Sequence, residues 1–109
     1  MASMPESSAM APSTFCTGVS IVIPHYGATQ ATLLLLNQLR DQLGARDEVI
    51  VVDDASPAPF PDTAGVIVLR RDKNGGFGAA VNTGAAVATG DLLLILNSDL
   101  EVGPTFVAD

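Results

Sequence analysis

Residues 19–26 read VSIVIPHY, and this stretch decides the fold class. Its opening residues are β-branched and mostly apolar, which predicts a buried strand, and Pro24 is expected to end that strand. Similar runs at 48–52, 66–69 and 92–96 predict three further strands. Because these runs are continuously apolar rather than alternating, we expect a parallel sheet that is covered on both faces.

Two helices are expected between the strands. The first is expected to start near Gln30, where the preceding Thr29 can cap its N-terminus. Gly44 can end this helix. Four leucines with spacings of three and four mark its buried face: Leu33, Leu36, Leu39 and Leu43. The alanine-rich residues 79–88 predict the second helix. The order strand, helix, strand, strand, helix, strand indicates an α/β protein of the βαβ type.

The composition predicts one small folded domain. The chain has 109 residues, of which 48% are hydrophobic, and its mean hydropathy is +0.38. This is too apolar for a disordered chain. Residues 1–17 are rich in Ala, Ser, Pro and Met and show no periodicity, so we expect a disordered N-terminal tail. The domain would then comprise residues 18–109.

Charge and hydropathy exclude several classes of partner. The formal net charge is -7 and there is no basic patch, which argues against nucleic-acid binding. The longest apolar runs, 33–36 and 92–96, are far shorter than the roughly 20 residues of a transmembrane helix. The N-terminus also lacks the pattern of a signal peptide. We therefore expect a cytoplasmic protein without a transmembrane segment, one that can lie peripherally at the inner face of the membrane.

Polar residues follow each predicted strand. Tyr26 comes after the first strand, Asp53 and Asp54 after the second, Asn74 with several glycines after the third, and residues 97–99 (NSD) after the fourth. In an open parallel sheet, ligands bind beyond the carboxyl ends of the strands. These residues are therefore expected to converge on one edge of the sheet.

Each of these groups suits a nucleoside diphosphate. A carboxylate such as Asp54 can accept the N3–H of a uracil or thymine ring, and Tyr26 can stack on the base. Gly76 and its glycine neighbours permit close backbone approach to a ligand. An acidic chain needs a cation to bind a diphosphate, and Asp99 can hold Mg²⁺ or Mn²⁺ for that purpose.

Four stretches resemble, in order and spacing, the motifs of family 2 glycosyltransferases, which have the GT-A fold. They are VSIVIPHY at 19–26, VVDDAS at 51–56, NGGFGAAVNTG at 74–84 and LILNSD at 94–99. The last lies where the family has its DxD metal motif, although Asn97 replaces the first Asp and an amide is a poorer metal ligand. This NxD form is similar to the rhamnosyltransferase-like branch of the family.

The resemblance implies a partial GT-A (Rossmann-like) parallel sheet flanked by helices and truncated after the metal motif. Residues 18–109 would be the N-terminal, nucleotide-sugar-binding half of the domain. The implied reaction is hexosyl transfer, with inversion, from a UDP- or dTDP-linked sugar to an acceptor hydroxyl, in cell-wall or polysaccharide biosynthesis.

The catalytic part of the enzyme is expected to lie further along the chain of the full-length protein. The resemblance implies that the general base follows Asp109, in the half of the domain that also binds the glycan or lipid-linked acceptor. No catalytic residue is therefore named among residues 1–109, and the chain alone is expected to be inactive.

The resemblance also implies roles for individual residues. Pro24 and Tyr26 would line the base pocket, Asp54 would bind the base, Asn97 would lie near the ribose and Asp99 would hold the metal. The complete expected nucleotide-sugar-binding set is Pro24, Tyr26, Asp53, Asp54, Asn74, Gly76, Asn82 and Asn97.

Simpler interpretations stand beside these roles. The simpler role of Asp53 is to orient its loop, and that of Asn82 is to hydrogen-bond a neighbouring loop. A structural role is favoured for His25, the single histidine. Residues 76–78 (GFG) open a helix after a strand, which partly resembles a dinucleotide-binding fingerprint. A non-catalytic remnant and a dinucleotide-binding module therefore remain the alternatives.

Overall fold

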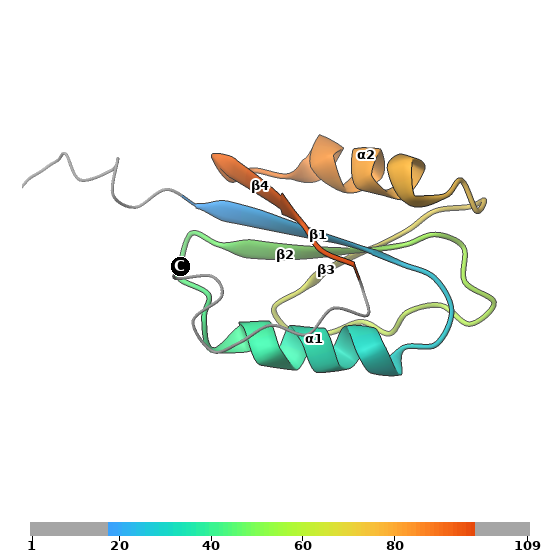
Figure 1. The fold of residues 1–109 in the computed structure, drawn as a ribbon, viewed down its shortest axis with the longest axis horizontal. Coiled ribbons are helices and arrows are strands. Elements are labelled where there is room, and N and C mark those ends of the chain that lie inside the picture. Colours follow the sequence, from blue (N-terminus) through green and yellow to red (C-terminus); the bar gives the residue numbers. More distant parts are fainter. Residues whose placement is uncertain (1–17, 98–109) are drawn as a thin grey trace, which may run out of the picture.

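The computed structural model describes residues 18–97. They form a four-stranded, all-parallel sheet in the order β3-β2-β1-β4, with one helix on each face (Figure 1). The elements are β1 (Val19–His25), α1 (Gln30–Arg40), β2 (Glu48–Asp53), β3 (Ile67–Arg70), α2 (Phe77–Val87) and β4 (Leu92–Ile95). The predicted α/β sheet flanked by helices is confirmed.

Three predictions fall on residues outside the described range. The first is the tail at 1–17, and the second is the metal ligand Asp99. The third is the extent of the domain to Asp109, beyond which the general base is expected. All three stay predictions.

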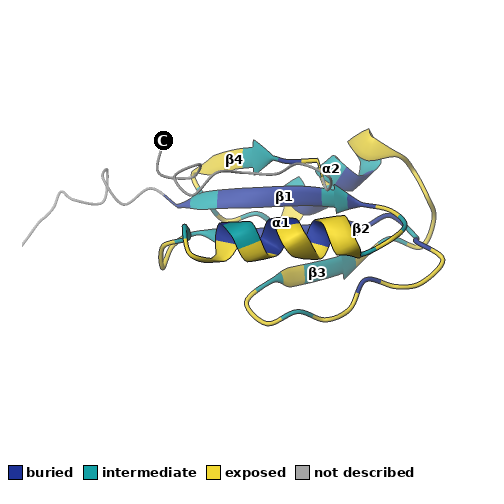
Figure 2. Cartoon of the chain, turned by 60° about the horizontal axis from the view of Figure 1, so that its bottom comes forward, coloured by how far each residue is buried: buried dark blue, intermediate teal, exposed yellow. Residues whose placement is uncertain are grey.

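The two faces of the sheet carry separate apolar clusters. Successive side chains of a strand point to opposite faces, so alternate residues of β1 and β2 enter different clusters. On the α1 face, the buried residues are Ile21, Ile23, Leu35, Leu36, Leu39, Val49, Val51, Phe60 and Leu96. On the α2 face, they are Val22, Ile50, Val52 and Ala80. The central strands are thus buried on both sides (Figure 2).

Helix α2 lies close to the sheet because its contact residue is a glycine. A Cβ atom on Gly84 would lie 2.5 Å from Val22 Cγ1 and 3.1 Å from Val52 Cγ2. A larger residue could therefore not occupy this position without a shift of the helix or the strands. The close packing also sets where the first turn of α2 lies beside the carboxyl end of β1.

The first strand and the first helix differ from their predicted extents. Strand β1 continues through Pro24, which pairs with Val52, to His25. The ladder between β1 and β4 has ended by then, at Val22, so the missing N–H of proline costs no bond on that side.

Helix α1 ends at Arg40 rather than near Gly44, because Gln42 N–H turns back to Leu39 O (2.9 Å). Thr29 occupies the N-cap position but makes no capping side-chain bond. The predicted buried face is also shifted: Leu33 is 38% exposed, and the buried residues are Thr32, Leu35, Leu36 and Leu39.

Strand β4 is less covered than its sequence predicts. Leu92 is 59% exposed and Leu93 is 48% exposed. The reason is topological, since β4 is an edge strand of the described sheet and pairs with β1 alone. Within residues 18–97, no helix is long and apolar enough to cross a membrane.

Candidate functional site

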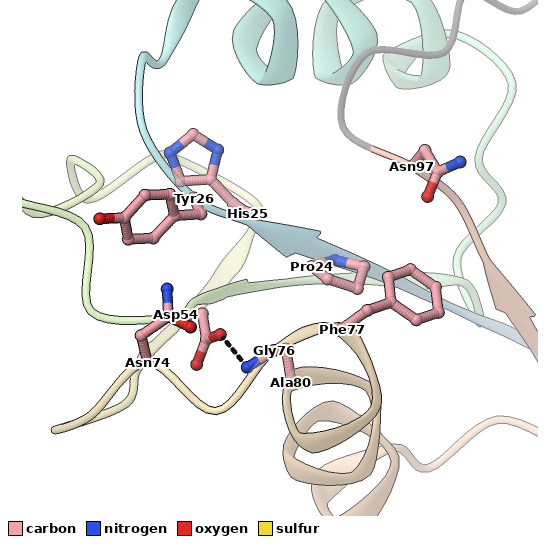
Figure 3. Close-up of a pocket in the computed structure, with 9 residues that line it drawn as sticks. All are labelled: Pro24, His25, Tyr26, Asp54, Asn74, Gly76, Phe77, Ala80 and Asn97. Atoms are coloured by element: carbon pink, nitrogen blue, oxygen red, sulfur yellow. Dashed lines mark hydrogen bonds between the residues drawn. The ribbon is translucent and has the colours of Figure 1, made fainter.

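A cavity of about 470 Å³ opens at the carboxyl ends of β1 and β2, beside the first turn of α2 (Figure 3). Its lining consists of Pro24, His25, Tyr26, Asp54, Asn74, Gly76, Phe77, Ala80 and Asn97. Among the expected site residues, the structure brings together Pro24, Tyr26, Asp54, Asn74, Gly76 and Asn97. Parallel strands produce this convergence because their carboxyl ends meet at the same edge of the sheet.

Among residues 18–97, two expected site residues, Asn82 and Asp53, are not part of this lining. Asn82 is exposed on α2, and Asp99 lies outside the described residues. Asp53 is fully buried, and its carboxylate accepts hydrogen bonds from Ser56 N–H (3.0 Å), Phe60 N–H (2.9 Å) and Arg70 Nη1 (2.7 Å). Asp53 therefore orients the loop after β2, which agrees with the simpler interpretation of this residue.

Asp54 links the loop after β2 to the start of α2. One carboxylate oxygen, Oδ2, accepts the Gly76 N–H at 2.8 Å, and the other, Oδ1, accepts Arg71 Nε at 2.8 Å. The Gly75 N–H is shared between the two oxygens at 3.1 and 3.2 Å. Burial raises the pKa of Asp54, but these N–H groups and the Arg71 guanidinium outweigh it and lower the pKa below 3.8. Asp54 is thus an ionised carboxylate at neutral pH.

The glycines of this turn are required by its geometry. Gly76 has φ +89°, a conformation that other residues rarely adopt. A Cβ atom on Gly75 would lie 2.7 Å from Arg71 Nη2 and 2.8 Å from Ala79 Cβ. The turn can therefore place two backbone N–H groups against Asp54 only because both positions lack side chains.

His25 lines the cavity, but its side chain makes its hydrogen bond and its ring contact with buried core residues. Its Nδ1 lies 2.7 Å from Thr32 Oγ1 on α1, and its ring packs edge-on against Phe60 with centroids 4.9 Å apart. Within residues 18–97, its Nε2 is buried without a hydrogen-bond partner. Burial lowers the pKa of His25 below 6.5, against the opposing effects of Asp53 and the Gly27 backbone. These contacts agree with the structural role that the sequence favours.

Two exposed aromatic rings flank the cavity. Tyr26 is 56% exposed and Phe77 is 57% exposed, and Figure 3 shows them on opposite sides of Asp54 and Gly76. Sequence reasoning names Tyr26 but misses Phe77, which it assigns to the glycine turn. The available signal is an aromatic residue directly after two glycines at the start of a helix. Ala80, one helical turn further on, lies in the helix predicted at 79–88 and is not named there as a site residue.

The described residues do not by themselves form a metal site. Residues 18–97 contain no group of three or more His, Cys, Asp or Glu side chains that could hold a metal ion. Among the described residues, Asp54 is the one carboxylate that lines the cavity, and its oxygens are already engaged by Arg71 and the glycine turn. Asn97 is exposed at the end of β4, two residues before Asp99 in the sequence.

Sequence comparison finds relatives along most of the chain. The profile of Glycosyl transferase family 2 matches residues 20–109. An uncharacterized glycosyltransferase of Haemophilus influenzae is 35% identical over 89 residues, which cover 74% of this chain and 29% of that protein. The dolichol-phosphate mannosyltransferase of Pyrococcus furiosus is 32% identical over 97 residues, which cover 82% of this chain and 28% of that protein.

Solved structures share the fold. The crystal structure of S. aureus TarS 1-349 superposes with a TM-score of 0.71 and 26% identity, covering 84% of this chain and 30% of that one. Mannosyltransferase PcManGT from Pyrobaculum calidifontis, solved in complex with GDP-Man and Mn²⁺, has a TM-score of 0.67 and 21% identity, with 84% and 32% covered. The expected GT-A fold is confirmed.

The chain spans less than a third of the length of these relatives. The family match nevertheless extends over all the elements that form the cavity, from β1 to the end of β4, and continues to Asp109. The chain therefore belongs to glycosyl transferase family 2.

Proposed function

We propose that this chain binds the donor of a glycosyltransferase that transfers a hexosyl group from a UDP- or dTDP-linked sugar to an acceptor hydroxyl, with inversion. The observation that carries the proposal is Asp54, an ionised carboxylate in the cavity wall next to the exposed ring of Tyr26. A uracil or thymine ring offers an N–H to such a carboxylate and a flat face to such a ring. Family membership supports the same class of ligand.

The remaining lining residues extend the proposed donor site. Asn74 and Gly76 would follow the nucleotide, and Asn97 would contact the ribose. The chain carries a net charge of -7, so the diphosphate requires a counter-charge. We propose Mg²⁺ or Mn²⁺ held by Asp99 for that role; a cation of this kind would stabilise the departing nucleoside diphosphate when bound.

The acceptor site and the general base are assigned to the full-length enzyme, beyond Asp109. Among residues 18–97, Asp54 is the one carboxylate that lines the cavity, and three N–H donors already engage it. It is therefore poorly placed to take a proton from an acceptor hydroxyl. We expect a glycan or lipid-linked acceptor, a rhamnosyl donor as one form of the hexosyl group, and a cytoplasmic or peripheral membrane location.

Calorimetric titration of the chain with UDP, dTDP and NAD, with and without Mn²⁺, tests the proposal. UDP or dTDP should bind weakly and only with the metal, and Asp99→Ala should remove that dependence. Asp54→Ala should weaken discrimination between bases, whereas Asp62→Ala, an exposed aspartate outside the cavity lining, serves as the matched control. Equal affinity with and without metal, or preferential binding of NAD, would contradict the assignment. Sugar transfer by the 109-residue chain alone would contradict the expectation that this chain is inactive by itself.

A further inference from the structure

The loop after β1 and the loop after β2 are joined by hydrogen bonds on both sides of Tyr26. On one side, Asp54 N–H donates to His25 O at 2.9 Å. On the other side, Gly27 N–H donates to Ser56 Oγ at 2.9 Å. The residue before Tyr26 and the residue after it are therefore both held by the loop after β2, although they are far from that loop in the sequence.

The chain turns sharply between the two residues of the β2 loop that make these bonds. Ala55 lies between Asp54 and Ser56 and has φ +64°; within residues 18–97 it is the one residue other than glycine with a positive φ. A left-handed conformation costs energy for alanine, so it persists where the surrounding contacts fix it. With this turn, the Asp54 N–H and the Ser56 hydroxyl both face the loop of Tyr26.

Ser56 is buried, with 1% of its surface exposed, and three partners fix it. Its N–H donates to Asp53 Oδ1 at 3.0 Å, and its carbonyl oxygen accepts Arg70 Nη2 at 3.0 Å. Its hydroxyl oxygen accepts the Gly27 N–H. The backbone of Ser56 is thus anchored to the ends of β2 and β3, while its side chain holds the neighbouring loop. A residue anchored in this way can order the loop that it bonds.

The carboxylate of Asp53 strengthens this anchor. Asp53 is fully buried, and Arg70 Nη1 lies 2.7 Å from its Oδ2. Burial raises the pKa of Asp53, but hydrogen bonds from Ser56, from the loop backbone and from Arg70 outweigh it and lower the pKa below 3.8. Asp53 is therefore ionised at neutral pH, and a charged acceptor forms stronger hydrogen bonds than a neutral one.

A second buried serine makes the same kind of bond at the other end of the sheet. Ser20 Oγ accepts the Gly90 N–H at 2.8 Å and donates to Glu48 Oε2 at 2.6 Å. Ser20 is fully buried, and neither it nor these two partners line the cavity. It is a matched control for Ser56, because each serine is buried and holds a glycine N–H with its hydroxyl oxygen.

We propose that Ser56 is a positioning residue for the nucleotide base, because its hydroxyl fixes the Gly27 N–H and thereby holds Tyr26 at the wall of the cavity before a ligand binds (Figure 3). This inference rests on the proposed function, in which the base stacks on Tyr26. Ser56 is not part of the cavity lining and is not assigned a contact with the ligand. A ring that is ordered in advance binds a base more tightly, since less entropy is lost on binding.

The first test uses the chain without nucleotide. Tyr26 is the single tyrosine and the chain has no tryptophan, so time-resolved fluorescence anisotropy reports the motion of this ring. In Ser56→Ala, the amplitude of fast motion should rise, and the Gly27 amide should exchange its hydrogen about fivefold faster, as the loss of one hydrogen bond implies. In Ser20→Ala, exchange should accelerate at Gly90 instead, and the anisotropy should stay unchanged.

The second test measures UDP binding by calorimetry with Mn²⁺ present. Ser56→Ala should bind UDP about fivefold more weakly than the unaltered chain, and Ser20→Ala should stay within about twofold of it. Because Ser56 acts through Tyr26, the change Ser56→Ala should have little further effect in a Tyr26→Ala chain. Losses that add up in the double variant, or an equal loss in Ser20→Ala and Ser56→Ala, would overturn the proposal.

Circular dichroism of each variant separates lost order at Tyr26 from lost folding. If Ser56→Ala does not fold, Arg70→Gln replaces it: this variant removes the bond to Ser56 O, and the Arg70 side chain is 43% exposed. It should increase the motion of Tyr26 and the exchange at Gly27 in the same direction. Unchanged motion and exchange in the folded variant would show that Ser56 does not position Tyr26. Failure of the unaltered chain to bind UDP would overturn the proposed function, while the measurements without nucleotide would still decide the positioning.

Discussion

Substituting Gly84 by alanine should destabilise the protein, although alanine is the better helix former. In an open helical position, Gly→Ala adds up to about 1 kcal/mol of stability. Here the new Cβ would lie 2.5 Å from Cγ1 of Val22, a β1 residue whose side chain is fully buried. Val22 cannot rotate away cheaply, because β-branched side chains have few χ1 rotamers and the surrounding core is close-packed.

The expected magnitude follows from two opposing contributions. Overpacking a core by one methyl group typically costs about 1–3 kcal/mol, so the net loss for Gly84→Ala is about 0–2 kcal/mol after the propensity gain. Gly78→Ala is the matched control, since it lies in the same helix and its Cβ would meet nothing within 4 Å. Both variants gain helix propensity, so the difference between them chiefly reports the contact with the sheet and should be up to about 3 kcal/mol.

Urea unfolding followed by circular dichroism measures both free energies of unfolding. Gly78→Ala should raise the midpoint and Gly84→Ala should lower it. If Gly84→Ala is as stable as Gly78→Ala, then α2 does not lie against Val22 and Val52 as described, and the position of its first turn beside the cavity is wrong. The same variant should weaken nucleotide binding, because a displaced α2 moves the Gly76 N–H away from Asp54.

Two further predictions concern ionisation and the aromatic rings. Lowering the pH from about 7 to about 5 should reduce the free energy of unfolding. Burial lowers the pKa of His25 below 6.5, so the unfolded chain binds a proton in this range that the folded chain does not bind. Urea unfolding at each pH should show this dependence, and a His25→Gln variant that keeps the same dependence would contradict the cause. Tyr26→Ala and Phe77→Ala should each weaken UDP binding, by up to about 1–3 kcal/mol if the ring stacks on the base. Leu33→Ala is the control, because Leu33 is exposed on α1 outside the cavity lining. If calorimetry finds that neither aromatic variant loses more affinity than Leu33→Ala, the stacking role is refuted.

The local sequence predicts the elements well and their limits less well. Continuous apolar runs identify the strands, because a strand buried on two faces tolerates few polar residues. The end of α1 and the course of β1 through Pro24 are mispredicted, because both depend on neighbours: a backbone bond from Gln42 to Leu39, and a ladder with β4 that stops at Val22. The burial of β4 is mispredicted because strand order, which a run of leucines does not encode, places it at an edge.

For the site, the sequence alone determined that polar residues would gather at the carboxyl ends of parallel strands, because strand direction follows from the βαβ order. It named Asp54, Tyr26 and Asn97, which the cavity brings together. Only the tertiary structure separated the roles of the two aspartates, since alternation turns Asp53 toward its own loop and Asp54 toward α2. Only the tertiary structure paired Asp54 with Arg71, 17 residues away. That pairing depends on the register of β2 and β3, and no local pattern fixes a register between strands so far apart in the chain.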